Sequence, residues 1–170
     1  NLENIKTIAD QANHDYLTQL YNRRYLFNAG STLHSNARRD HIKITVAVLD
    51  IDFFKKINDS LGHEAGDAAL IAVAAELKRS LRSGDIVARI GGEEFCIVAV
   101  NVENPLILIE HMRNRVESLS ITGSWGNPIR LTLSAGFTST PGDSFESMVR
   151  QADKALYQAK AAGRNCSIGI

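Results

Sequence analysis

This sequence lacks an excess of charge of either sign: its 170 residues hold 19 Lys and Arg and 19 Asp and Glu. A net charge near zero argues against general binding to nucleic acids. The two cysteines, Cys96 and Cys166, are too few for a disulfide framework and show no Cys-x-x-Cys spacing, so they indicate a reducing compartment. No apolar run approaches the roughly 18 residues that span a bilayer, and there is no signal-peptide pattern. We therefore expect a cytoplasmic domain that makes no membrane contact itself.

The length suits one domain with a full hydrophobic core. Hydrophobic residues make up 44% and charged residues 22%, as in soluble globular proteins. Leu2, Ile5 and Ile8 recur at helical spacing in an otherwise polar N-terminal segment. Because the chain begins at Asn1 and not at Met, we expect a fragment of a longer protein. Residues 1–13 would be the end of an upstream coupling helix, and residues 14–170 the domain itself.

The hydrophobic pattern predicts the order of the elements. Strand-forming residues fill 44–49 without interruption, which is typical of a central strand buried on both faces. Apolar and polar residues alternate over 129–138, so that strand has one more polar face. The other patterns predict strands at 86–90, 95–100 and 166–170, and helices at 23–38, 67–81, 104–119 and 145–163. This order predicts an α/β (α+β) sandwich with helices packed on a central, largely antiparallel sheet.

Two pairs of acidic residues stand where predicted strands end. Asp50 and Asp52 follow the strand at 44–49, and Glu93 and Glu94 follow a glycine pair in the predicted hairpin. Strands lying side by side would bring these acids together, and clustered carboxylates hold Mg²⁺ for phosphate chemistry. Burying an unpaired carboxylate costs roughly several kcal/mol, which a cation would offset. The alternative is that the acids reach water or pair with a nearby cation, namely Lys55, Lys56 or Arg89.

Five ordered motifs resemble those of the GGDEF family of diguanylate cyclases. They are residues 15–24 (DYLTQLYNRR), 50–58 (DIDFFKKIN), 62–67 (GHEAGD), 91–95 (GGEEF), and 155–160 (ALYQAK) followed by 163–165 (GRN). The resemblance covers about residues 14–170. It implies a bacterial signalling enzyme whose fold is similar to nucleotidyl cyclases and polymerase palm domains. Such domains join two GTP molecules into cyclic di-GMP and release pyrophosphate.

The resemblance also implies roles for the acidic residues. Asp50 and Glu93 match the carboxylates that coordinate Mg²⁺, with Mn²⁺ as an alternative, and Ile51 matches the residue that adds its backbone carbonyl. Magnesium usually keeps substrate phosphates among its ligands, which fits so few protein ligands. Glu94 is the second acid of the motif. It either holds a second ion or helps to deprotonate the attacking 3′-hydroxyl, and the sequence does not separate these roles.

Asn58 and Asp67 match the positions that read guanine. A carboxylate accepts from the guanine N1–H and N2–H₂ groups, and an amide meets O6 or N3. The alternative for Asp67 is a helix-capping acid.

The resemblance places the triphosphate on backbone amides and cations. Phe53 and Phe54 fall in the loop whose amides would touch the phosphates. The matching cations are Lys55, Lys160 and Arg164, although the sign of the last two is also explained by the dipole of a helix end. Gly91 and Gly92 would allow close approach of the nucleotide, and the alternative is a tight hairpin turn alone.

A second site is implied by Arg82-x-x-Asp85, which matches the family's inhibitory site for the cyclic product. Arginine forks onto a guanine edge or a phosphate, and Asp85 accepts from guanine. The end of a helix already explains Arg82. Arg113 is the expected third member, with Arg115 as the competitor.

The reaction implies a partner of the same kind, because one active half-site holds one GTP and bond formation requires two domains facing each other. We therefore expect a homodimer during turnover, with GTP as substrate and cyclic di-GMP as product and inhibitor. The domain would lie in the cytoplasm, either in a soluble protein or as the cytoplasmic end of a membrane-bound sensor. The rival interpretation is a catalytically silent receptor of the same fold that binds cyclic di-GMP or GTP.

Overall fold

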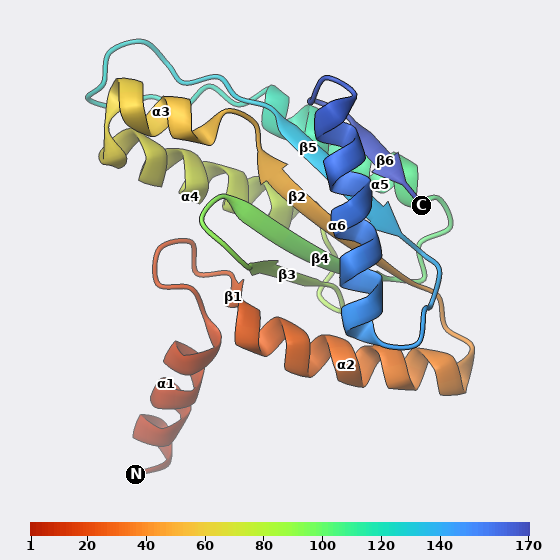
Figure 1. The fold of residues 1–170 in the computed structure, drawn as a ribbon. Coiled ribbons are helices and arrows are strands. Elements are labelled where there is room, and N and C mark those ends of the chain that lie inside the picture. The colour runs from red at the N-terminus through yellow and green to blue at the C-terminus, as the bar shows by residue number, and fades with distance from the viewer.

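One six-stranded sheet organises the chain in the computed structural model, which describes residues 1–170 (Figure 1). The strand order is β1-β3-β4-β2-β5-β6, with antiparallel pairs inside and a parallel pair at each edge. The predicted, largely antiparallel sheet is therefore confirmed, with the edge strand β1 as an addition. The strands are β1 (Tyr21–Asn22), β2 (Ile44–Ile51), β3 (Ile86–Arg89), β4 (Glu94–Val100), β5 (Leu133–Thr138) and β6 (Ser167–Gly169).

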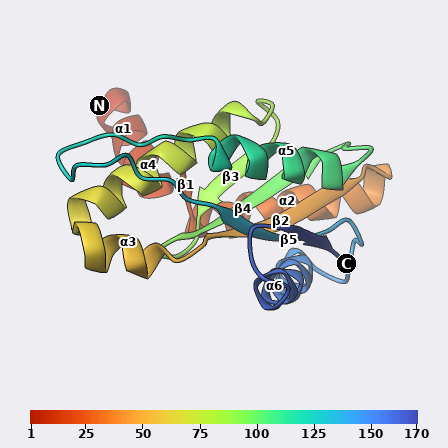
Figure 2. The same ribbon diagram turned by 90° about the horizontal axis from the view of Figure 1, so that it is seen from above.

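Helices cover both faces of the sheet, as the view from above shows (Figure 2). One hydrophobic core joins the sheet to α4 and α5, and a second core joins it to α2 and α6. The helices are α1 (Leu2–Asn13), α2 (Arg23–Asp40), α3 (Phe54–Leu61), α4 (His63–Arg79), α5 (Pro105–Glu117) and α6 (Phe145–Ala161). None of them is both long and apolar enough to cross a bilayer.

Strand β2 is buried along its whole length, as its uninterrupted apolar run predicts. Ala47, Leu49 and Ile51 pack in the core under α4 and α5, whereas Val46 and Val48 pack in the core under α2 and α6. Side chains alternate between the faces of a strand. The next residue on the second face is therefore the acid at position 50, which faces α6.

Strand β5 is shorter than the alternating pattern suggests. Its polar side is not exposed, because all six residues of the strand are buried. Ser134 and Thr138 instead make hydrogen bonds within the protein, Thr138 to Gln151 of α6 at 3.0 Å. Gly136 lies between them, and a side chain there would overlap backbone atoms of Ala152 and Leu156. The polar alternation therefore marks close packing of α6 on the sheet.

The loop predicted at Phe53 and Phe54 is wrong for Phe54, which begins helix α3 and is buried. Phe53 precedes the helix in a left-handed conformation with φ 56° and an exposed ring. The apolar spacing of Phe54, Ile57 and Leu61 carries a short helical signal that was missed. Helix α4 begins at His63, so Asp67 lies in its second turn and does not cap it.

Helix α1 confirms the predicted N-terminal helix, yet it buries none of its residues. It projects away from the sheet, and Leu2, Ile5 and Ile8 are exposed at 79%, 62% and 65% (Figure 1). The helix is joined to the domain at its end, where the Ala12 carbonyl accepts from Asn22 Nδ2 at 2.8 Å. That α1 is the end of an upstream coupling helix stays a prediction.

Candidate active site

The ends of β2 and β4 bring the predicted acids together. Asp50 lies directly opposite Glu94 in the antiparallel register, and residues paired in this way share a face of the sheet. The backbone N–H of Ile51 donates to the Glu93 carbonyl at 3.3 Å. The expected meeting of the two acidic segments is therefore present in the fold. Gly91 and Gly92 form the turn between β3 and β4, and Gly92 is exposed with open space around it.

The cation that meets these acids is Lys160 of α6, whose Nζ donates to Asp50 Oδ2 at 2.9 Å. Burial raises the pKa of the Asp50 carboxyl above its ordinary value, Lys160 opposes the rise, and Glu93 adds to it. Burial also raises the pKa of Glu94, with Asp50 and then Asp153 adding to the rise. The acids therefore disfavour one another's charged forms, a situation that a bound cation relieves.

None of the cations that the sequence offered as partners for these acids takes that place. Lys55 is exposed and pairs with Asp59 on its own helix at 2.9 Å. Arg89 donates through Nη1 to Asp15 at 3.2 Å and through Nε to the Gly92 carbonyl at 3.0 Å. Arg89 therefore joins the N-terminal segment to the glycine turn. The pairing alternatives with Lys55 and Arg89 are wrong.

The donor set fits Mg²⁺ that is shared with phosphate. Two carboxylates and a backbone carbonyl are hard oxygen ligands, the type that Mg²⁺ prefers. No cluster of three or more His, Cys, Asp or Glu side chains is arranged to hold a metal ion. A complete octahedron would therefore need oxygen atoms from substrate and water, as is usual for Mg²⁺.

Asp52 lies close to these acids but has a different environment. Its carboxylate accepts from Ser134 Oγ at 2.6 Å, Thr132 Oγ1 at 2.7 Å and the Asn165 backbone N–H at 3.0 Å. Only 5% of the residue is exposed. Asp52 is thus saturated by neutral donors and joins β2 to β5 and to the turn after α6. Sequence reasoning missed this role, although Thr132 and Ser134 alternate on one face of the predicted partner strand.

The two predicted guanine readers come from neighbouring helices. Asn58 lies on α3, and the exposed Asp67 lies on α4. The amide of Asn58 packs over Gly66, where a Cβ atom would overlap the amide oxygen. Gly66 therefore supports Asn58, a contact for which the sequence held no signal beyond the motif.

Phe53 lies beside one of the predicted phosphate cations, Arg164. Its ring, 60% exposed, lies 5.0 Å from the guanidinium of Arg164 and 5.7 Å from the ammonium of Lys56. Cations over an aromatic face are attracted by its quadrupole. Lys160 thus reaches the acids and Arg164 lies against the Phe53 ring, whereas Lys55 points toward solvent. Lys56 was not among the predicted site residues.

The predicted inhibitory pair is held by the end of β4. Arg82 Nη2 donates to the Val100 carbonyl at 2.7 Å, and Asp85 Oδ1 accepts from the Val100 N–H at 3.0 Å. The Asp85 side chain is only 4% exposed. Both residues line a small cavity of about 220 Å³ with His14 and Tyr21, next to the end of α1.

Arg113 does not lie beside this pair. Its guanidinium donates to Asn165, which precedes β6, whereas Arg115 lies 3.6 Å from Glu76 of α4. Residues two apart on a helix point to different sides. No hydrogen bond or ion pair joins either arginine to Arg82 or Asp85, so the third member of the inhibitory site stays a prediction, with Arg113 and Arg115 as its candidates.

Known proteins share the sequence that carries this site. A family model described as diguanylate cyclase, GGDEF domain, matches residues 12–166. This chain belongs to the GGDEF family. The response regulator PleD of Caulobacter vibrioides is 37% identical over 160 residues, which are 91% of this chain and 35% of PleD. The diguanylate cyclase DgcP of Pseudomonas aeruginosa is 41% identical over 154 residues, 89% of this chain and 23% of DgcP. The GGDEF domain thus spans only a part of these relatives.

Solved structures confirm the predicted fold class. The coiled coil and GGDEF domain of DgcB from Caulobacter crescentus, in complex with c-di-GMP, gives a TM-score of 0.93 at 31% identity, over 99% of this chain and 91% of that one. The active GGEEF domain of a diguanylate cyclase from Vibrio cholerae gives 0.81 at 32% identity, over 89% of this chain and 97% of that one. The first of these aligns over nearly all of our chain, α1 included.

Proposed function

We propose that this GGDEF domain is a diguanylate cyclase that condenses two GTP molecules into cyclic di-GMP. The observation that carries the proposal is the pairing of Asp50 with Glu94 next to an intact glycine turn, with Lys160 at 2.9 Å from Asp50. A receptor that has lost catalysis has no need of this arrangement. The named cyclase DgcP and the c-di-GMP complex of DgcB support the same substrate class.

In each of two equivalent steps, the 3′-hydroxyl oxygen of one GTP attacks the α-phosphorus of the other. A P–O bond forms, the bond from the α-phosphorus to the bridging oxygen breaks, and pyrophosphate leaves. Mg²⁺ held by Asp50, Glu93 and the Ile51 carbonyl would stabilise the charge that develops on phosphate oxygens. Glu94 either accepts the proton of the hydroxyl or holds a second ion.

The remaining residues bind and orient the nucleotide in this proposal. Asn58 and Asp67 hydrogen-bond the guanine, while Lys160 and Arg164 neutralise the triphosphate. Lys160 would exchange its bond to Asp50 for one to a phosphate oxygen of the bound nucleotide. Backbone amides at Phe53 and at the start of α3 offer further donors, since the first N–H groups of a helix lack partners within it.

Incubation of concentrated protein with GTP and Mg²⁺, followed by chromatography, tests the proposal. We expect cyclic di-GMP and pyrophosphate to accumulate. A forced dimer that binds GTP yet forms no cyclic di-GMP would favour the rival, a silent receptor.

Product inhibition through Arg82 and Asp85 belongs to the same proposal. An Arg82→Ala variant that cyclic di-GMP inhibits as strongly as it inhibits the original protein would refute this inhibitory role.

Gly66→Ala tests guanine reading by Asn58. Alanine in a helix interior is more stable than glycine by about 1 kcal/mol, so we expect no loss of thermal stability. The added Cβ displaces the flexible Asn58 amide and removes its hydrogen bond to guanine. The KM for GTP should rise about tenfold, the equivalent of one hydrogen bond. Steady-state kinetics measure this effect. An unchanged KM would show that Asn58 does not read the base.

Pairing of two domains through α1 is also part of the proposal, with residues 1–13 as the end of a coupling helix and 14–170 as the cyclase domain. Leu2, Ile5 and Ile8 recur at every third residue and form one exposed apolar stripe along α1, which a second helix would cover. A helix of 12 residues is marginal on its own, so the stripe needs a partner or a longer helix.

We expect Ile5→Lys to weaken that pairing because a charge in an apolar seam opposes burial. Specific activity should rise with protein concentration in the original protein and stay lower in the variant at each concentration. Sedimentation velocity gives the dimer fraction directly. Thr7→Lys adds the same charge on another side of α1 and serves as the control. Equal dimer fractions in Ile5→Lys and Thr7→Lys would argue against pairing through this stripe.

A further inference from the structure

The turn that follows α6 has an unusual backbone. Gly163, Arg164 and Asn165 all have positive φ, at 112°, 66° and 47°. Positive φ is uncommon outside glycine, although asparagine tolerates it better than most residues. Three such residues in a row form a fixed reversal between α6 and β6. Something in the surrounding structure must hold the two that are not glycine.

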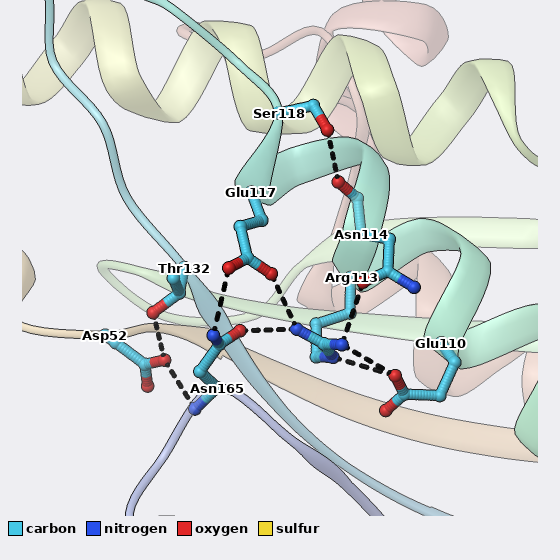
Figure 3. Close-up of polar contacts among 8 residues, drawn as sticks. All are labelled: Asp52, Glu110, Arg113, Asn114, Glu117, Ser118, Thr132 and Asn165. Carbon is cyan, nitrogen blue, oxygen red and sulfur yellow. Dashed lines mark hydrogen bonds and ion pairs between the residues drawn. The ribbon is translucent and has the colours of Figure 1, made fainter.

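A polar network holds the last residue of this turn from three directions (Figure 3). The Asn165 backbone N–H donates to Asp52 Oδ2 at 3.0 Å. Its side-chain oxygen accepts from Arg113 Nη1 at 2.5 Å, and its Nδ2 donates to Glu117 Oε1 at 3.3 Å. The turn is thereby tied to the central strand β2 and to helix α5.

Arg113 is itself fixed, so it can fix Asn165. Its guanidinium donates to Glu110 at 2.8 Å and to Glu117 at 2.9 Å, and its side chain is 12% exposed. Hydrogen bonding from Arg113 lowers the pKa of Glu110, consistent with a charged pair. Partly buried ion pairs contribute little net stability but can specify one geometry. We therefore infer that this network mainly fixes the position of Asn165.

The turn carries one predicted phosphate cation and begins three residues after the other. Arg164 lies inside the turn, held with its guanidinium 5.0 Å from the Phe53 ring. Lys160 lies in the last turn of α6 and reaches Asp50. Asp52, two residues along β2 from Asp50, receives the backbone of Asn165. The network therefore connects both cations to the strand that carries the catalytic acid.

We propose that Asn165 and Arg113 are positioning residues that align Arg164 and Lys160 with the triphosphate of GTP. This inference rests on the proposed function. It assigns Arg113 to the active site's support and not to the inhibitory site. Displacing catalytic or binding groups by about 1 Å can cost a hundredfold in rate, so a rigid turn matters for the reaction.

Asn165→Gly tests the proposal with little disturbance of the fold. Glycine keeps the backbone N–H that Asp52 accepts and adopts φ 47° without strain, while the bonds to Arg113 and Glu117 are lost. Binding is measured by calorimetry with an uncleavable α,β-methylene analogue of GTP and with GMP. We expect the analogue to bind about tenfold more weakly, which corresponds to roughly 1.4 kcal/mol. GMP binding should change much less, since it lacks the β- and γ-phosphates.

Asn114→Ala is the matched control. It removes a bond to the same guanidinium, from Arg113 Nη2 at 2.8 Å, on a residue that does not contact the turn (Figure 3). Affinity for the analogue should stay within about twofold. The thermal midpoint of each variant separates a loss of stability from a loss of binding. Because binding is measured without turnover, a failure of the cyclase proposal would appear as absent product and not as a changed contrast between ligands.

The proposal is overturned if Asn165→Gly lowers the thermal midpoint but leaves the affinity for the analogue unchanged, since the network would then be structural only. It is also overturned if GMP and the analogue weaken equally. If Asn165→Gly does not fold, Asn165→Asp gives the same contrast. Aspartate keeps an acceptor for Arg113 but loses the donor to Glu117 and opposes its charge, so an intermediate weakening specific to the analogue is expected.

Discussion

The Glu93→Gln variant is expected to form cyclic di-GMP about a thousandfold more slowly than the original protein, without unfolding. Glutamine has nearly the same shape as glutamate but carries no charge, so it is a poor ligand for Mg²⁺. The Glu93 backbone carbonyl still accepts from Ile51, which keeps the strand ends together. The loss would therefore report the carboxylate and not the fold. Initial rates of product formation at saturating GTP measure it.

Asp153→Asn is the control for this experiment. Asp153 lies on α6 near enough to raise the pKa of Glu94, so it contributes negative potential to the same region. Its removal should change the rate by less than about threefold, because exposed charges interact weakly through water. Full activity in Glu93→Gln would refute the metal role. Equal losses in both variants would indicate that the total charge matters and not a specific ligand.

The elements that bring the acids together were predictable because their signals are local and strong. The β-branched, apolar run before Asp50 is typical of a buried strand, and the glycine pair before Glu93 is typical of a hairpin turn; both are present in the structure. Once both are placed in one sheet, antiparallel pairing brings Asp50 opposite Glu94. The hydrophobic pattern thus predicted the strands that carry the acids, and the family motifs implied the role of each acid.

Other parts of the site could not be predicted because their signals are spread over distant segments. Asp52 is saturated by donors from residues 132, 134 and 165, and no pattern in the sequence joins those positions. Helix α3 was missed because it is short and begins after a left-handed residue without a capping side chain. Arg113 was assigned to the inhibitory site only because it lies in the helix that follows Arg82 and Asp85. The side of α5 on which its side chain lies depends on where that helix begins.

Gly136→Ala is expected to reduce the free energy of unfolding by about 3 kcal/mol, a large part of the roughly 5–15 kcal/mol typical of a domain. The added Cβ meets the backbone of Ala152 and Leu156 in α6, not a flexible side chain. Relief requires the whole helix to move away from β5. Denaturant unfolding, followed by circular dichroism, measures the change through its midpoint.

Gly84→Ala is the control for this substitution, because no atom lies within 4 Å of the Cβ it would add. Its free energy of unfolding should stay within about 0.5 kcal/mol of that of the original protein. An equal midpoint for Gly136→Ala would show that α6 can shift at little cost. If α6 does move, Lys160 moves away from Asp50, so affinity for GTP should fall at temperatures where the variant is still folded. Tight packing at Gly136 and the network at Asn165 thus act on the same helix from different points: one holds its distance from the sheet, the other fixes its end.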